Sequence, residues 1–171
     1  MVSGGRGEVR DVLTEDLPCE LLHARLTATL ATVADDGSIH VVAMWFLWDG
    51  DALLIPTSHA TRKVRNLERD PRATVMIDDS RGGFDLRGVT LVGRAEIVRG
   101  EAASLLNRRI HLKYVTEEGL ALEPVRRYLS TDDVTIRFMP ERVSSWDLAA
   151  TEQARSLTEG RLYLPLVPRL P

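Results

Sequence analysis

The sequence predicts a mainly β domain, a small antiparallel barrel of about six or seven strands with helices packed outside it. Three observations predict this fold. Short segments in which Val, Ile, Leu or Thr alternate with polar residues recur between residues 26 and 147, as in strands with one buried face. The turn sequences DDGS at 35–38 and DG at 49–50 join the first of these segments as antiparallel neighbours. A single helical segment interrupts the first five strands.

Composition narrows the class of protein. The chain has 171 residues, 44% of them hydrophobic, which suits one domain with one core. Its 22 basic and 25 acidic residues give a net charge of -3, so no overall positive field attracts nucleic acid. Cys19 is the only cysteine, which excludes an internal disulfide and a metal site built from cysteines. Without a signal peptide or a run of about 18 apolar residues, we expect a cytoplasmic protein with no membrane span.

The chain divides into three parts. Residues 1–14 are Gly-rich and charged, and we expect a disordered leader there. Residues 15–148 carry the strand pattern and form the barrel domain. Residues 149–171 form a C-terminal tail that ends in the apolar, Pro-rich segment LYLPLVPRLP. This tail either lies extended against a partner subunit or is loose.

The first half of the domain reads as a meander followed by a helix. A short helix over Leu17–Ala24 precedes three predicted strands, at 26–34, 39–48 and 52–57. Ser58 then caps a helix from about His59 to Arg69, because Ala60, Val64 and Leu67 recur at helical spacing as a buried stripe. Asp70-Pro71 ends this helix.

The second half returns to strands after one longer helical region. Strands are predicted at 73–79 and 87–98, on either side of a mobile loop at 80–84, and Gly93 marks a bulge or a tight bend. The helical region runs from Glu101 to Tyr128, with a break near Glu118-Gly119 and a new turn at Pro124. Two last strands, 134–139 and 142–147, lie on either side of Pro140.

The segment TSHATRKVRNLERDP, residues 57–71, is the first candidate for a functional site. One interpretation is a solvated helix face whose arginines and lysine are partly compensated by Glu68. The other is an anion site, because free N–H groups and the positive end of the helix dipole meet at the helix start. Arg62 and Lys63 favour the second, since cations are unfavourable in a first helical turn unless an anion compensates them.

The segment HVVAMWFLW, residues 40–48, is the second candidate. In a strand, alternate side chains share a face, so Met44, Phe46 and Trp48 point one way and Trp45 the other. Packing in the core explains the apolar side chains of Met44, Phe46 and Trp48. Trp45 is free to line a pocket or a subunit interface.

A family resemblance covers roughly residues 18–148. The segments that carry it are LTATLATVADDGSIHVVAMWFLWDGDALLIPTSHATRKVRNLERDPRATVMIDD, RGVTLVGRAEIV and PERVSSWDL. They resemble the flavin and deazaflavin oxidoreductases of the split β-barrel superfamily, which includes pyridoxamine-phosphate oxidase. The resemblance implies a homodimeric split β-barrel whose cofactor ring lies at the subunit interface and whose cofactor phosphate is held at the helix start.

The resemblance also implies a set of cofactor-binding residues in this chain. They are His40, Val41, Val42, Met44, Pro56, Thr57, Ser58, Thr61, Arg62, Lys63 and Trp146. The helix-start members hold the phosphate, and His40 stands where the oxidases often place a phosphate-binding arginine. Val41, Val42 and Met44 lie along the ring, and Trp146 matches the late tryptophan that reaches the cofactor near the interface.

Departures from the oxidases narrow the chemistry. Trp45 replaces the lysine that binds a substrate phosphate in the oxidases, so we place Trp45 in the substrate pocket. Glu152 and Ser156 replace basic residues after the late tryptophan, and Gly88 replaces an amide side chain that contacts the ring. The basic residues that bind a vitamin-phosphate substrate in the oxidases are therefore missing from this chain. Trp45 and the segment WFLWDGDALLIPTSHATRKVRNL resemble most the actinobacterial branch that uses the deazaflavin coenzyme F420, and FMN is the alternative cofactor.

The activity that follows is hydride transfer from reduced F420 to a small unsaturated or conjugated organic acceptor. No catalytic residue is assigned: the proton comes from solvent, or from a side chain such as His40 or Tyr114. The other histidines show no metal-ligand spacing, so we expect no metal site. The same fold also suits a non-catalytic binder of flavin, deazaflavin or haem, or a cofactor-free dimer, because a fold does not determine a function.

Overall fold

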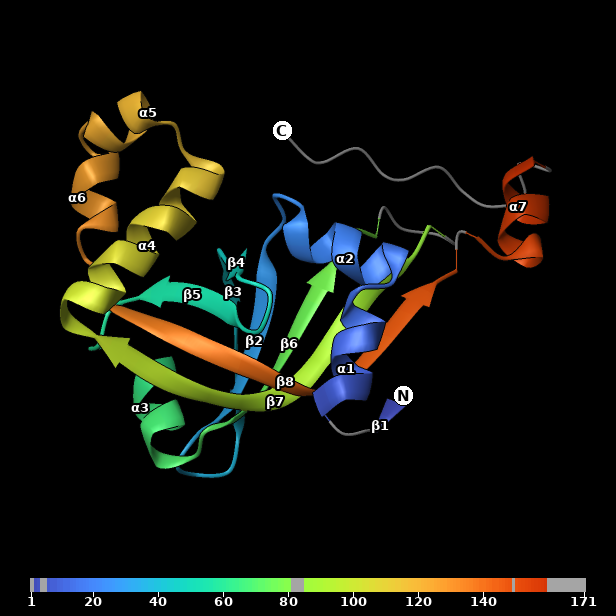
Figure 1. Cartoon of the computed structure of the whole chain (residues 1–171), viewed down its shortest axis with the longest axis horizontal. Helices are drawn as coiled ribbons and strands as arrows, with labels where there is room; N and C mark the ends of the chain where they lie inside the picture. The colour runs from blue at the N-terminus through green and yellow to red at the C-terminus, as the bar shows by residue number, and fades with distance from the viewer. Residues whose placement is uncertain (1, 4–5, 81–84, 149, 160–171) are drawn as a thin grey trace.

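The structure, a computed structural model, describes residues 2–3, 6–80, 85–148 and 150–159. It is mainly β, as the sequence predicts, with helices around one antiparallel sheet (Figure 1). The described strands are β1 Val2–Ser3, β2 Ala28–Val33, β3 Ile39–Met44, β4 Leu47–Trp48, β5 Leu53–Thr57, β6 Arg72–Asp78, β7 Arg87–Arg99 and β8 Val134–Asp147. The described helices are α1 Arg6–Leu13, α2 Asp16–His23, α3 Arg62–Arg69, α4 Gly100–Tyr114, α5 Glu117–Ala121, α6 Val125–Leu129 and α7 Glu152–Glu159.

The sheet has the strand order β3-β2-β6-β7-β8-β5-β4, and β1 pairs with β8 outside this path. Every pairing is antiparallel. The long strands β7 and β8 run across the whole molecule, with α4, α5 and α6 at one end and α1 and α2 at the other (Figure 1). β8 pairs with β7 along its length and with β5 at its start, so β8 joins the two halves of the sheet. In the described part of the chain, no helix is long and apolar enough to cross a membrane.

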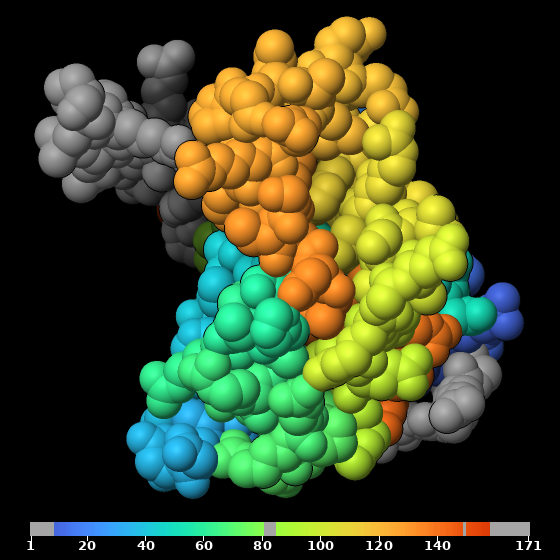
Figure 2. All heavy atoms as spheres, turned by 90° about the vertical axis from the view of Figure 1, so that its left-hand side faces the viewer, coloured from blue at the N-terminus to red at the C-terminus, as the bar shows by residue number. Residues whose placement is uncertain are grey.

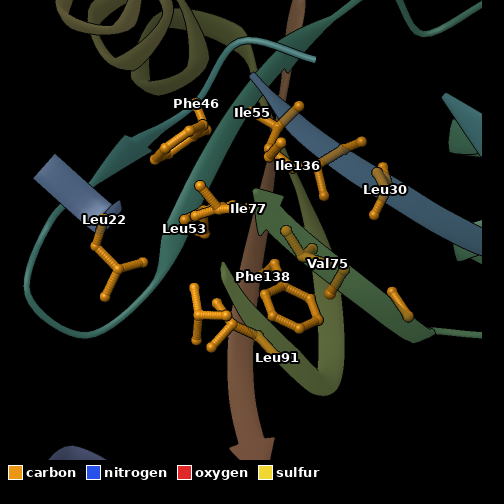
Figure 3. Packing of buried hydrophobic residues seen from close by; sticks show 14 of the residues in the cluster. Leu22, Leu30, Phe46, Leu53, Ile55, Val75, Ile77, Leu91, Ile136 and Phe138 are labelled. Carbon is orange, nitrogen blue, oxygen red and sulfur yellow. The ribbon is translucent and has the colours of Figure 1, made fainter. Parts of the chain in front are cut away.

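The core lies on the inner face of the curved sheet. β2 alternates buried and half-buried residues along its length, as the sequence pattern predicts. Leu30, Val75, Leu91 and Phe138, from four different strands, are fully buried and point toward one another (Figure 3). β5 is buried at all five positions because β4 and β8 flank it while α4 packs against it.

Three boundaries differ from the sequence prediction. The expected strand 39–48 is two strands, because the chain leaves the sheet at Trp45. The two last expected strands are one strand, β8, because a bulge between Val92 and Gly93 accommodates Pro140 without breaking the pairing. The helix expected from His59 begins at Arg62, so its N-cap is Thr61 and not Ser58, and Ala60 is exposed.

The two ends of the chain also differ in part from expectation. Residues 6–13 form α1 instead of a disordered leader, because a helix brings Val9 and Leu13 to one face, where both are buried in the core. Within the expected tail, residues 152–159 form α7. The loop residues 81–84, together with Ala149 and residues 160–171, lie outside the described residues.

The phenol of Tyr114 holds the chain at the point where it leaves the sheet after β3. Its oxygen accepts a hydrogen bond from the backbone N–H of Phe46 at 3.1 Å. It lies 2.8 Å from the carbonyl oxygen of Leu26 and 3.0 Å from that of Phe46, so its single proton has two acceptors. Burial raises the pKa of Tyr114. The Tyr114 hydroxyl is thus engaged with backbone groups and is not the free proton donor considered from the sequence.

Replacing Tyr114 by Phe is expected to lower the free energy of unfolding by about 2 kcal/mol, because the Phe46 N–H loses its partner in a part-buried site. Urea unfolding followed by circular dichroism measures this change. Tyr128→Phe is the matched control, since the Tyr128 side chain is exposed, and we expect it to change stability by less than about 0.5 kcal/mol. Equal effects of the two substitutions would contradict the role of the Tyr114 hydroxyl.

Candidate functional site

The candidate anion site lies between the end of β5 and the first turn of α3. The Thr57 and Lys63 side chains are buried there, although both are polar. The Thr61 hydroxyl donates a hydrogen bond to the carbonyl oxygen of Ser58 at 2.8 Å and lies 3.5 Å from the Thr57 hydroxyl. The first turn of α3 contains no acidic residue. The first N–H groups of an α-helix have no partner within the helix, so this end offers donors to an anion.

Lys63 is the central group of this site. Its residue is only 8% exposed, and its ammonium forms no hydrogen bond or ion pair with the described residues. Burial lowers the pKa of Lys63, and the charge of Asp132 partly opposes this shift. Most of the Lys63 side chain is buried, but its Nζ atom is not fully closed off from solvent, because it is not among the buried side-chain atoms of the described residues that lack a partner. The site therefore suits an anionic ligand that would complete the partners of Lys63.

The other basic residues of 57–71 have different roles. Arg62 is exposed; its charge contributes, after the Ser38 hydrogen bonds, to lowering the pKa of Asp36 in the β2–β3 turn. Arg65 donates a hydrogen bond to the carbonyl oxygen of Ala60 at 2.6 Å, and Arg69 donates one to that of Val33 at 2.5 Å. The structure thus buries Lys63 at the site, whereas Arg62, which was predicted beside it, lies on the surface.

β3 contributes residues from both of its faces. His40, Val42 and Met44 alternate with Ile39, Val41 and Ala43, and the first three are the less exposed set. Val42 and Met44 pack against the core, whereas Val41 is 56% exposed on the other face. The side chains of Val41 and Val42 therefore point to opposite faces of β3. That both residues lie along the cofactor ring, as the family resemblance implies, stays a prediction. The Nδ1 atom of His40 is buried and has no hydrogen-bond partner among the residues that the structure describes.

Trp45 forms one wall of a pocket next to the anion site. Its indole stacks on the Tyr114 ring, with centroids 4.7 Å apart, and meets the edge of the His111 ring at 6.4 Å. The pocket has a volume of about 240 Å³. It is lined by Thr27, Ala43, Met44, Trp45, Pro56, Tyr128, Leu129 and Asp132. Three residues predicted for the site, Met44, Trp45 and Pro56, are thus brought together.

Two histidine–aspartate pairs connect the elements around this pocket. Nε2 of His111 on α4 lies 3.0 Å from Oδ2 of Asp132. The backbone N–H of His59 donates to Oδ1 of Asp133 at 2.7 Å, and the His59 ring contacts the same carboxylate. Figure 2 shows the segment that leads into β8, in orange, between the green α3 region and the yellow-green α4. Sequence reasoning missed Asp132 and His111, because long-range pairing leaves no local pattern.

Trp146 lies away from the anion site within one chain. It pairs with Gly88, and its indole occupies the space that a Cβ atom at residue 88 would need, at 2.3 Å. Thr57 pairs with Val134 at the start of β8, whereas Trp146 lies near the other end of that strand (Figure 1). One chain alone therefore does not bring Trp146 to the anion site.

Lys113, on α4 beside Tyr114, is a half-buried cation that the sequence did not indicate. Its Nζ lies 3.7 Å from the centroid of the Phe46 ring and 3.5 Å from the carbonyl oxygen of Leu22. Burial lowers the pKa of Lys113 to about 8. The charged form is therefore disfavoured in the folded protein.

Replacing Lys113 by Met is expected to stabilise the protein by about 1 kcal/mol at pH 7, a value reduced for partial exposure of the side chain. The folded pKa is about 8 and that of an unfolded lysine 10.5, so between these values the unfolded chain holds more protons. The free energy of unfolding of the parent protein therefore rises with pH over that range, and the stability that Lys113→Met gains over the parent becomes smaller. Urea unfolding at pH 7 and at pH 10 measures the stability gain and its decrease with pH. Arg109→Met is the control, because the Arg109 side chain is exposed. An advantage that is constant with pH would contradict the assignment.

No group of three or more His, Cys, Asp or Glu side chains that would suit a metal ion is found among the described residues. The donors at the site are instead the Lys63 ammonium, the Thr57 hydroxyl and the helix N–H groups, which suit a phosphate.

Comparison with known proteins agrees with this arrangement. The family model described as pyridoxamine 5'-phosphate oxidase matches residues 19–147. An F420 reductase of known structure has 29% sequence identity and a TM-score of 0.59, over 73% of this chain and 94% of its own. A conserved hypothetical protein from Mycobacterium tuberculosis has 29% identity and a TM-score of 0.63, over 96% and 91% of the two chains.

A heme storage protein from Vibrio cholerae shares the fold at 23% identity and a TM-score of 0.59, over 75% of this chain and 90% of its own. A search of the curated proteins finds no match for this chain. The family match covers β2 to β8, which include both the buried lysine and the Trp45 pocket. The chain belongs to the pyridoxamine 5'-phosphate oxidase family, a family of flavin-binding oxidoreductases with this fold.

Proposed function

We propose that the protein is an oxidoreductase that uses reduced coenzyme F420 to transfer a hydride to a small unsaturated or conjugated organic acceptor. The observation that carries this proposal is the buried Lys63, which lacks an anionic hydrogen-bond partner and lies next to the Trp45 pocket. An F420 reductase at 29% identity supports the choice of cofactor.

The residues that would hold the cofactor phosphate are those at the end of β5 and the start of α3. Lys63 would supply the charge, and the hydroxyls of Thr57 and Ser58 would supply further donors. The Thr61 hydroxyl donates to the carbonyl oxygen of Ser58 in the free protein and would have to turn from it to bind a phosphate. His40 fits the same task, because its Nδ1 atom is buried and unpaired. When bound, the cofactor supplies the hydride.

The chain's own part in the reaction is placement and exclusion of water. Trp45 is fixed by its stacking on Tyr114, and together with Met44 and Pro56 it gives the acceptor a mostly apolar wall. Tyr114 is occupied by backbone groups, so the proton comes from solvent or from His40.

The proposal includes a homodimer. Met76 and Ala43 both pair with Thr29, so Met76 lies on the outer face of the sheet with Ala43 and Val41. On the same face, Met76 pairs with Thr90, Thr90 with Ser144, and Trp146 follows two residues later. Exposed apolar side chains on this face suit a second copy, which would bring its Trp146 to the cofactor. Light scattering is expected to give twice 19.1 kDa, and a monomer that binds cofactor fully would contradict this part.

Titration of the purified protein with F420 and with FMN tests the cofactor. We expect a saturable change in F420 fluorescence and weaker binding of FMN. Tight FMN binding without any response to F420 would overturn the F420 assignment in favour of an FMN enzyme. Binding without oxidation of the reduced cofactor by any enone or quinone would instead indicate a carrier or a storage protein.

A further inference from the structure

Among the described residues that line the Trp45 pocket, Asp132 is the one with an acidic side chain. The other side chains that line the pocket are apolar or aromatic, apart from the hydroxyls of Thr27 and Tyr128. The Asp132 side chain is 18% exposed, so its carboxylate is only partly hydrated. A carboxylate in such a wall favours a ligand group that donates a hydrogen bond or carries positive charge.

The position of Asp132 is fixed by several contacts. Its Oδ2 atom contacts His111, and its backbone N–H donates to the carbonyl oxygen of Leu129 at 3.1 Å. Its own carbonyl oxygen accepts from Asn107 at 2.9 Å. Its Oδ1 atom forms no hydrogen bond with the described residues. One carboxylate oxygen of Asp132 is therefore without a protein partner among the described residues, in a residue that lines both the Trp45 pocket and a second hollow beside Arg108 and Arg126.

The charges around Asp132 do not neutralise it when the cofactor is bound. The charge of Asp132 acts on Lys63, whose pKa it raises. The proposed function assigns Lys63 to the cofactor phosphate. Arg108 pairs with Glu117 and Arg126 pairs with Glu123, so both nearby arginines already have partners. With a phosphate at Lys63, no lysine or arginine of the described residues is left to pair with the carboxylate of Asp132, which contacts the His111 ring.

We infer that Asp132 determines the substrate class: the acceptor is a planar conjugated molecule with an N–H or O–H donor, or a positive charge, at its edge, and anionic acceptors are rejected. This inference rests on the proposed function. The conjugated plane lies against Trp45, and the donor meets Oδ1 of Asp132. A site built to pair one polar group discriminates strongly against a ligand that cannot pair it.

Three acceptors with the same ring test the inference: 1,4-naphthoquinone, its 2-sulfonate and its 6-amino derivative. With saturating reduced F420 or FMN, whichever the protein binds, we expect the parent to prefer the amino compound and to use the sulfonate least. Asp132→Asn keeps the shape and removes the charge. It is expected to reduce the kcat/KM ratio of amino compound to sulfonate by about 10-fold or more.

Asp133→Asn is the matched control. It makes the same change in net charge at the next residue, but Asp133 is 46% exposed and does not line the pocket. We expect it to leave the ratio between the acceptors unchanged. Asp132→Ala removes the same charge and serves if the Asn variant does not fold.

Quenching of tryptophan fluorescence by the three compounds gives their dissociation constants without turnover, and the ratios are expected to change in the same way. Unchanged ratios in the Asp132 variants, or equal changes in Asp133→Asn, would overturn the inference. A parent protein that oxidises reduced cofactor with none of the acceptors would instead contradict the proposed function, while the fluorescence ratios would still decide the role of Asp132.

Discussion

Replacing Lys63 by Met is expected to weaken binding of the phosphate-bearing cofactor by about 100- to 1000-fold, because the variant loses a charged hydrogen bond at a site shielded from water. Met fills a similar volume without a charge. The Lys63 side chain is mostly buried and its ammonium has no anionic hydrogen-bond partner among the described residues, so we expect the free energy of unfolding to stay the same or to rise. Fluorescence titration with F420 and FMN, together with urea unfolding, measures both effects.

Arg62→Met is the matched control for this experiment. It removes a cation from the adjacent residue of the same helical turn, but Arg62 is exposed and acts on Asp36. We expect less than about a threefold loss of affinity, since exposed charges are screened. Equal losses in the two variants would show that the phosphate responds to the general charge of the helix start. Charge reversal of Lys63 to Glu is a poorer test, because it buries a carboxylate and risks unfolding.

Most of the fold follows from patterns that are local in the sequence. Alternation of residues predicts β2, β3 and β6, which each have one buried face, and the turns at 35–38 and 49–50 predict the short connections from β2 to β3 and from β4 to β5. The prediction failed where tertiary contacts decide. Residues 39–48 are apolar apart from His40 and contain no turn residue, yet the chain leaves the sheet at Trp45 because Tyr114, far along the chain, provides a ring for stacking and partners for the Phe46 backbone.

The candidate site was predictable to a similar extent. The helix start indicated an anion site, because the dipole and the basic residues act within one turn. Only the structure separates Lys63 from Arg62, since burial depends on how α3 packs against β2 and β7. Asp132 and His111 belong to different elements and meet only through the placement of α4 beside the start of β8. Trp146 lies away from the site in one chain, and the implied contact with the cofactor requires a second copy.

The second large effect is expected at Gly93, in the bulge between β7 and β8. Gly93→Ala should lower the free energy of unfolding by about 3 kcal/mol, at the upper end of the usual cost of overpacking. A Cβ atom there would lie 2.1 Å from the carbonyl oxygen of Met139 and 2.9 Å from Cα of Pro140. Both contacts are with backbone, so no side chain can turn away to relieve them. Urea unfolding with circular dichroism measures the loss.

Gly37→Ala separates this close contact from the ordinary cost of replacing a glycine. Gly37 has a φ of 80° with no atom within 4 Å of an added Cβ, so its substitution costs only backbone strain, about 1 kcal/mol. A Gly93→Ala variant no less stable than Gly37→Ala would contradict the close packing of the bulge. Such a result would also question the site, because the bulge lets β8 follow β7 while its first residues pair with β5 and bring Val134 next to Thr57. We therefore expect Gly93→Ala to weaken cofactor binding as well, whereas Gly37→Ala should leave it unchanged.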